Sequence, residues 1–365
     1  MLSRMKFETE GLVTEMLNQL PQAVWTSTTT TFLDPAIGGG QFVREIESRL
    51  RDAGHSDVNI ASRVFGFEES MLHVRFAVNK YKLLGFYTKL PYEDFFSIGT
   101  AMKFDVIVGN PPYNDNNQGF WKEFAIKSMQ LVKPNGYVGL ITPNSWANGS
   151  HLNKPKNIFN SIFQKYQTLV ISTDVNSHFP KIGKNISYWI VQNIKPSTIT
   201  KVISPVETTD VELKNYPFFI NEFSATGLAI FKKVLAKKSL WKEFKERPSK
   251  NAKEFGFPKA KHTSYRYGYK YNSLLHNFPT SRAIVGIDCT NYTLDEVKNI
   301  ETQFDTSLFK FLWRIYGAHD AGSVGWILRC MPKLDVSSSW NDDGVAEFFK
   351  FTDEEQEFIK KTLNR

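Results

Sequence analysis

Short apolar strands alternate with amphipathic helices along the first half of the chain, and this alternation limits the possible folds most strongly. Runs such as "RVFGFE" (63–68) and "FDVIVG" (104–109) have the length and apolar content of buried strands. Each is followed by a segment with helical spacing of apolar residues, "SMLHVRFAVNKYKLLG" (70–85) and "FWKEFAIKSMQLV" (120–132). The pattern persists to about residue 194 and predicts a mostly parallel sheet covered by helices on both faces.

The chain is too long for one ordinary core, because 365 residues exceed the size at which single domains usually stop growing. The alternation of strands and helices fades after "KPSTIT" (195–200), which we interpret as a linker. We therefore expect two domains, residues 1–196 and residues 197–365.

The formal net charge of +8 favours an anionic partner. Residues 232–270 hold thirteen Lys/Arg and only three Asp/Glu, so the net positive charge of this segment is larger than that of the whole chain. Aromatic residues are interleaved with the basic ones. Lys and Arg neutralise phosphates and aromatic rings stack on bases, so the segment is a candidate nucleic-acid surface, although a solvated helix face is the alternative interpretation.

The two cysteines, Cys289 and Cys330, are far apart and form no CxxC motif, which predicts a reducing, cytoplasmic environment rather than a disulfide framework. No apolar run is long enough to span a membrane, and the N-terminus lacks the apolar core of a signal peptide. We expect a cytoplasmic protein without a membrane partner.

A glycine-rich turn follows the first strand in "FLDPAIGGGQF" (32–42) and differs from the GxGxxG pattern that holds a pyrophosphate. Glycine permits close approach of the backbone to a ligand, and Asp34 would attract an ammonium group and repel a phosphate. Glu68 ends the next strand, where an acid can bind a ribose diol. Asp94 and Phe95 then place a carboxylate beside an aromatic ring. Each signal alone is also consistent with a structural role.

The strand "FDVIVG" ends in "NPPY" (110–113). The amide oxygen of Asn110 and the carbonyl of Pro111 are acceptors, and two prolines make the loop rigid and remove two donors. Tyr113 adds a flat ring. This set suits a planar base with an amino group, whose two hydrogens would be accepted while its nitrogen attacks an electrophile. A proline-rich structural turn is the alternative interpretation.

In this order, the motifs resemble those of the S-adenosylmethionine-dependent amino-methyltransferases, and specifically the gamma-class DNA N6-adenine methyltransferases of restriction–modification systems. The resemblance covers about residues 7–194 and continues more loosely to the C-terminus. It implies an α/β fold, in which residues 1–196 form a Rossmann-like methyltransferase domain with a mostly parallel seven-stranded sheet. Residues 197–365 would form an α+β DNA target-recognition domain.

The resemblance also implies S-adenosylmethionine as the cofactor and double-stranded DNA as the partner, in a bacterial or phage-infected bacterial cell. The methyl group would go to N6 of an adenine flipped out of the duplex. A cognate restriction endonuclease is a candidate second partner. A metal-dependent nuclease motif such as PD…ExK was not found, so we expect methylation without cleavage and no metal site.

The same resemblance assigns roles to single residues. Those expected to bind the cofactor are Thr9, Asp34, Pro35, Gly38, Gly40, Glu68, Asp94 and Phe95. The catalytic residues would be Asn110, Pro111, Pro112 and Tyr113. Tyr113 and Phe179 would pack against the flipped adenine. The candidate DNA-binding residues of the basic segment are Lys259, Lys261, Arg266 and Lys270.

The motif "NPPY" does not by itself identify the methyl acceptor, because it also occurs in enzymes that methylate rRNA adenines or a protein glutamine amide. A DNA-binding module that has lost the chemistry is a further alternative. Cytosine-carbon methylation is disfavoured, because neither Cys289 nor Cys330 follows a proline as the nucleophile of those enzymes normally does.

Overall fold

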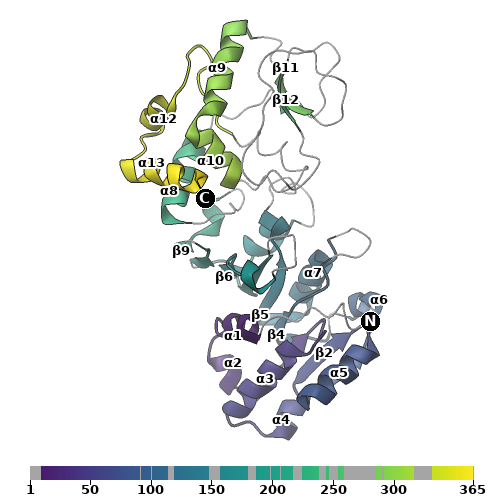
Figure 1. Cartoon of the computed structure of the whole chain (residues 1–365). Helices are drawn as coiled ribbons and strands as arrows, with labels where there is room; N and C mark the ends of the chain where they lie inside the picture. Colours follow the sequence, from purple (N-terminus) through teal and green to yellow (C-terminus); the bar gives the residue numbers. More distant parts are fainter. Residues whose placement is uncertain are drawn as a thin grey trace. The chain divides into compact units, whose positions relative to one another are not determined.

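The structure is a computed structural model that describes residues 10–90, 92–99, 101–113, 119–147, 157–179, 186–197, 199–205, 207–216, 224–237, 244–245, 254–258, 284–288, 292–315 and 331–364. The chain forms two compact units (Figure 1). Unit 1 comprises Met1–Trp146 and Lys154–Pro217, and unit 2 comprises Ala147–Asn153 and Phe218–Arg365.

A nine-stranded sheet with the order β3-β2-β1-β4-β5-β7-β6-β8-β9 forms the centre of unit 1. Its strands are β1 (Phe32–Asp34), β2 (Val64–Glu68), β3 (Phe86–Lys89), β4 (Phe104–Gly109), β5 (Val132–Pro143), β6 (Gln167–Ser172), β7 (Ile186–Gln192), β8 (Thr200–Ile203) and β9 (Thr208–Val211). Strands β3, β2, β1, β4 and β5 are parallel neighbours, and β7 runs antiparallel between β5 and β6. The predicted mostly parallel, Rossmann-like α/β fold is confirmed.

The expected number of seven strands is wrong. Strand β3 is a four-residue edge strand, and β8 and β9 extend the opposite side of the sheet past residue 196. Thr200, the last residue of the predicted linker, begins β8. These three strands escape detection because each has only four residues and is partly exposed, without the continuous apolar run of the central strands.

The described helices of unit 1 are α1 (Glu10–Leu17), α2 (Ala23–Thr26), α3 (Gln41–Asp52), α4 (Asp57–Ala61), α5 (Met71–Tyr81), α6 (Tyr92–Ser97) and α7 (Trp121–Leu131). Helices α1, α3, α5 and α7 form where the apolar spacing predicts them, whereas the short helices α2, α4 and α6 were not predicted. Helices α3 and α5 are neighbours, because a Cβ added to Gly40 at the start of α3 would lie 2.7 Å from the Cβ of Ala77 in α5. The sheet core is fully buried at Phe32, Leu33 and Ile107.

A single carboxylate oxygen ties three strands together at their amino ends. Asp105 Oδ2 in β4 accepts hydrogen bonds from the backbone N (2.8 Å) and Oγ1 (2.7 Å) of Thr31, just before β1. It also accepts one from Lys133 Nζ in β5, at 2.7 Å. Partial burial acts to raise the pKa of Asp105, but these hydrogen bonds outweigh it and the pKa is lowered.

We expect Asp105→Asn to lower the free energy of unfolding at pH 7 by roughly 1 kcal/mol, a modest loss because the carboxylate is partly exposed. Since the folded-state pKa is depressed, the contribution is complete above the unfolded pKa of about 3.9 and is lost as the pH falls through the folded value. Urea unfolding of both proteins should therefore give a difference that shrinks below about pH 4. Asp210→Asn, at an exposed position of β9, is the control and should change little. A difference independent of pH would contradict the assignment.

Unit 2 combines five helices with a small sheet among the residues described. The helices are α8 (Ala225–Ala236), α9 (Leu294–Asp305), α10 (Ser307–Ile315), α12 (Asp342–Phe349) and α13 (Asp353–Leu363). The antiparallel sheet has the order β10-β12-β11, formed by β10 (Phe244–Lys245), β11 (Glu254–Pro258) and β12 (Ile284–Asp288). This composition is α+β, as predicted for the C-terminal part.

Helix α8 is joined to helix α13 by a partly buried ion pair. Lys233 Nζ lies 2.7 Å from Glu355 Oε2 in α13 and donates to the carbonyl of Lys350, also at 2.7 Å. Glu355 also completes the capping box that begins α13 at Thr352. Within the described ranges, no helix has the length and apolar character needed to cross a membrane.

Candidate functional site

The candidate site lies at the carboxyl ends of the parallel strands of unit 1. Asp34, Glu68 and Gly109 are the last residues of β1, β2 and β4. Because these strands are parallel neighbours, their final residues share one edge of the sheet. The hydrogen bonds of Asp105 with Thr31 and Lys133 lie at the opposite edge of the sheet. They stabilise the sheet without occupying the candidate site.

The turn after β1 is closed by an acid and two glycines. Asp34, with 1% of its surface exposed, accepts a hydrogen bond from the backbone N of Ala36 at 3.0 Å. Gly38 and Gly40 have φ angles of +53° and +87°, which L side chains rarely adopt. A Cβ on Gly38 would meet only the carbonyl of Ala36, at 3.8 Å. The backbone at Gly38 is therefore open to close approach by a ligand.

The Glu68 carboxylate joins the end of β2 to this turn. Glu68 Oε2 accepts from the backbone N of Gly38 at 3.0 Å, and Oε1 accepts from the backbone N of Ser70 at 3.1 Å. His73 Nδ1 of α5 lies 3.2 Å from the same Oε1. The two acids that the sequence singled out are thus brought together with the glycine turn, and His73 is an additional contact.

Gly109 places the "NPPY" segment directly against the glycine turn. A Cβ on Gly109 would lie 3.2 Å from Cδ of Pro35 and 2.6 Å from Asp34 Oδ1, and real Cβ atoms essentially never come as close as the second of these distances. Asn110 follows immediately and is partly exposed. The structure therefore joins the expected cofactor-binding turn to the expected catalytic loop through one glycine, which the sequence analysis did not single out.

Helix α6 carries Asp94 with an exposed side chain, whereas Phe95 is 1% exposed and belongs to the core. The ring of Phe95 stacks on Phe124 of α7 at 5.2 Å and lies 6.0 Å from Phe67, next to Glu68. Contact of Phe95 with a cofactor stays a prediction.

A buried cation fixes the end of α6. Lys127 Nζ in α7 donates to the carbonyls of Phe96 (2.9 Å) and Ile98 (2.6 Å) at the C-terminal end of α6. Burial lowers the pKa of Lys127. This lysine therefore fixes the helix that carries Asp94.

The structure describes some of the remaining predicted site residues but not all of them. Pro111 is buried, Pro112 is partly exposed and Tyr113 is 5% exposed. Phe179, 7% exposed, follows β6 at the same sheet edge, three strands along from β4. The stacking roles of both rings stay predictions. The residues that lie outside the described part of the chain are Thr9, Lys259, Lys261, Arg266 and Lys270.

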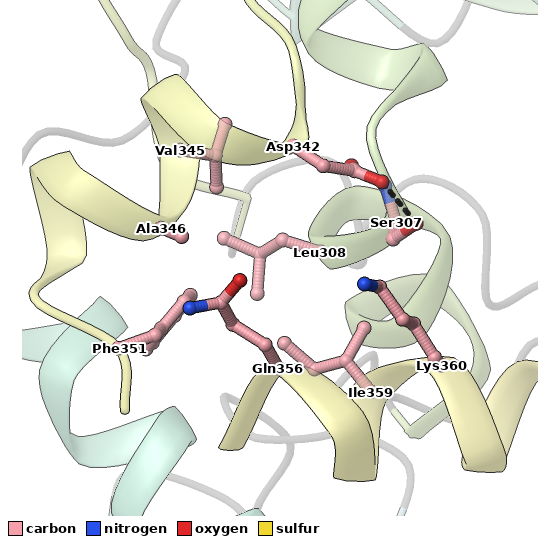
Figure 2. Close-up of a pocket in the computed structure, with 9 residues that line it drawn as sticks. All are labelled: Ser307, Leu308, Asp342, Val345, Ala346, Phe351, Gln356, Ile359 and Lys360. Atoms are coloured by element: carbon pink, nitrogen blue, oxygen red, sulfur yellow. Dashed lines mark hydrogen bonds between the residues drawn. The ribbon is translucent and has the colours of Figure 1, made fainter. Parts of the chain in front are cut away.

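A separate cavity lies among the helices of unit 2 (Figure 2). Leu308, Val345 and Ile359 contribute apolar side chains, and Asp342 accepts hydrogen bonds from the backbone N and hydroxyl of Ser307 at 2.6 and 2.7 Å. The cavity volume of about 20 Å³ is enough for a single water molecule. It is too small for a nucleotide or an S-adenosyl cofactor, so we do not assign the site here.

The fold and the position of these side chains define a Rossmann-like α/β protein with a candidate ligand site at the carboxyl ends of its strands. Residues 68–178 match the model of the Eco57I restriction-modification methylase family. The match begins at Glu68, contains Asp94 and "NPPY", and ends one residue before Phe179. For this segment, it confirms the resemblance to restriction–modification methylases.

Known proteins resemble parts of the chain. An "Uncharacterized adenine-specific methylase" of Mycoplasma pneumoniae is 29% identical over 163 residues, covering 39% of this chain and 37% of the relative. The M protein of the type I restriction enzyme EcoKI is 14% identical, with a TM-score of 0.43, covering 54% of this chain and 48% of that chain. The type IIG restriction endonuclease BpuSI is 13% identical, with a TM-score of 0.42, and the match covers 63% of this chain and 28% of that chain. The chain thus spans less than half the length of each of these proteins.

Four residues of the site were missed by the sequence analysis: Gln41, His73, Gly109 and Lys127. Gly109 directly precedes the motif, so its position was a usable signal. His73 and Lys127 are polar residues on helices, and a helical pattern does not distinguish an exposed polar residue from one that contacts a neighbouring element. Gln41 follows the glycine turn as the first residue of α3, and its burial is not visible in the sequence.

Proposed function

We propose that the protein is a DNA adenine methyltransferase that uses S-adenosylmethionine to methylate N6 of an adenine flipped out of double-stranded DNA. The observation that carries this proposal is the close approach of Gly109 to Asp34 and Pro35, which puts the "NPPY" segment beside the glycine turn. The family match over residues 68–178 supports the same reaction class.

The turn fits the proposed cofactor in its chemistry. Gly38 leaves its backbone open, and Glu68 can accept hydrogen bonds from a ribose diol at the end of β2. Asp34 and Glu68 give the turn a negative character that suits the positive charge of a sulfonium cofactor. Asp94 would accept from the amino group of the cofactor's adenine. Once bound, S-adenosylmethionine supplies an electrophilic methyl group.

The loop residues would then position the acceptor. Asn110 Oδ1 and the carbonyl of Pro111 accept the two hydrogens of the adenine amino group, so its nitrogen can attack in line. The bound S-adenosylmethionine would supply the methyl group, Asn110 and Pro111 would hold the amino nitrogen that accepts it, and the amino proton would be lost to solvent. Tyr113 and Phe179 would flank the base, once it has been taken out of the stack.

Target recognition is proposed for residues 197–365, with residues 1–196 as the catalytic part. Strands β8 and β9 of this C-terminal part complete the large sheet of unit 1. The basic, aromatic-rich segment supports DNA as the partner, with Lys259, Lys261, Arg266 and Lys270 as candidate phosphate contacts. A cognate restriction endonuclease is the second partner expected of a restriction–modification methylase.

The test is transfer of a labelled methyl group from S-adenosylmethionine to unmethylated genomic duplex DNA, followed by nucleoside analysis. N6-methyladenine is the expected product. Parallel incubations with ribosomal RNA and with protein extract separate the alternatives, because label in either one but not in DNA would overturn the DNA assignment. Absence of label in all three would overturn the proposed reaction.

A further inference from the structure

The side chain of Gln41 has a buried acceptor that the fold does not use. Gln41 is the first residue of α3 and is only 4% exposed. Its Oε1 is buried and has no hydrogen-bond partner among the described residues. Most buried polar atoms in proteins are hydrogen-bonded, and an unsatisfied acceptor is costly, so this oxygen calls for an explanation.

The amide of Gln41 lies against the glycine turn. A Cβ added to Gly39 would lie 2.6 Å from Oε1, 2.8 Å from Nε2 and 3.1 Å from Cδ of Gln41. The side chain therefore folds back over the turn between β1 and α3. It occupies space that exists only because residue 39 is a glycine.

The surroundings of this turn determine which ligand group suits the oxygen. The backbone donors of Ala36 and Gly38 are already bound by the carboxylates of Asp34 and Glu68. Two acids and an amide oxygen together favour a cationic hydrogen-bond donor, because hydrogen bonds between a charged donor and such oxygens are stronger in a partly buried site than in water. An ammonium group meets this description, whereas a phosphate or carboxylate would be repelled.

We propose that Gln41 binds the amino-acid end of the cofactor, with Oε1 accepting a hydrogen bond from its α-ammonium group. This inference rests on the proposed use of S-adenosylmethionine and adds a recognition residue to it. Gln41 would discriminate between cofactors that carry the ammonium group and analogues that lack it.

The test compares three ligands by isothermal titration: S-adenosylhomocysteine, its deamino analogue and its decarboxy analogue. The wild type should bind the deamino analogue more weakly than the other two. Gln41→Leu should weaken binding of S-adenosylhomocysteine and the decarboxy analogue by roughly tenfold and leave the deamino analogue nearly unchanged. Gln41→Glu keeps an acceptor at this position and should retain the preference for the ammonium group.

Gln130→Leu, at an exposed position of α7, is the matched control and should bind all three ligands as the wild type does. Circular dichroism melting verifies that each variant folds, and Gln41→Met serves as a second replacement. If Gln41→Leu weakens the deamino analogue but not the decarboxy one, the amide binds the carboxylate and the stated contact is wrong. Unchanged affinities in both replacements would also overturn it. A wild type that binds none of the ligands would instead overturn the proposed cofactor.

Discussion

Asn110→Ala is expected to reduce the rate of methyl transfer by at least about a hundredfold, while binding of S-adenosylhomocysteine stays as in the wild type. The variant would lose one of the two acceptors proposed to hold the adenine amino group, whereas Asp34, Gly38 and Glu68 of the turn are untouched. Single-turnover transfer to duplex DNA measures the rate, and titration calorimetry measures the affinity for the cofactor product.

The control for this experiment is Asn215→Ala, because Asn215 is an exposed asparagine of the same unit. It should transfer methyl groups at the wild-type rate. A fully active Asn110→Ala enzyme would show that the amide does not act on the target base. An equal loss of cofactor binding would show that the substitution disturbs the turn, so the catalytic role could not be maintained.

Gly109→Ala is expected to weaken binding of S-adenosylhomocysteine by at least about tenfold and to destabilise unit 1 by about 1–3 kcal/mol. The added methyl group would lie 2.6 Å from Asp34 Oδ1, which is buried and held by Ala36. Either β4 or the turn after β1 has to move. Calorimetric titration and urea unfolding measure the two effects.

Gly11→Ala is the matched control, since a Cβ at this exposed position of α1 meets nothing within 4 Å. It should not destabilise the protein. Introducing Gly109→Ala into an Asp34→Ala background should cost less than in the wild type, because the carboxylate that would clash is gone. Strictly additive losses of stability would contradict the proposed contact.

Local signals allowed much of this fold to be predicted. The central strands β1, β2 and β4 are apolar runs bounded by turns, and the helices between them have clear 3.6-residue spacing. The ends of these strands then placed Asp34, Glu68 and Asn110 at one edge, because parallel strands leave no other arrangement. For these residues, sequence spacing was sufficient.

Contacts between distant residues could not be predicted in this way. The hydrogen bond from Gly38 to Glu68 spans 30 residues, and the bond from Lys127 to the carbonyl of Phe96 spans 31. Gln41 is a polar residue at the start of α3, yet it is buried against Gly39. In each case packing of separate elements decides the environment, and a periodic pattern carries no information about which elements meet.

The ion pair of Lys233 with Glu355 has a consequence for the order in which the chain is completed during synthesis. The large sheet has all nine strands once Val211 has been made. By contrast, Lys233 of α8 lacks its carboxylate partner until Glu355 of α13 has been made, more than a hundred residues further along the chain. The N-terminal part of a chain leaves the ribosome first. The sheet of unit 1 can therefore form while unit 2 still lacks the ion pair between α8 and α13. A nascent chain stopped before α13 would therefore contain a finished sheet and a C-terminal unit without its closing helix.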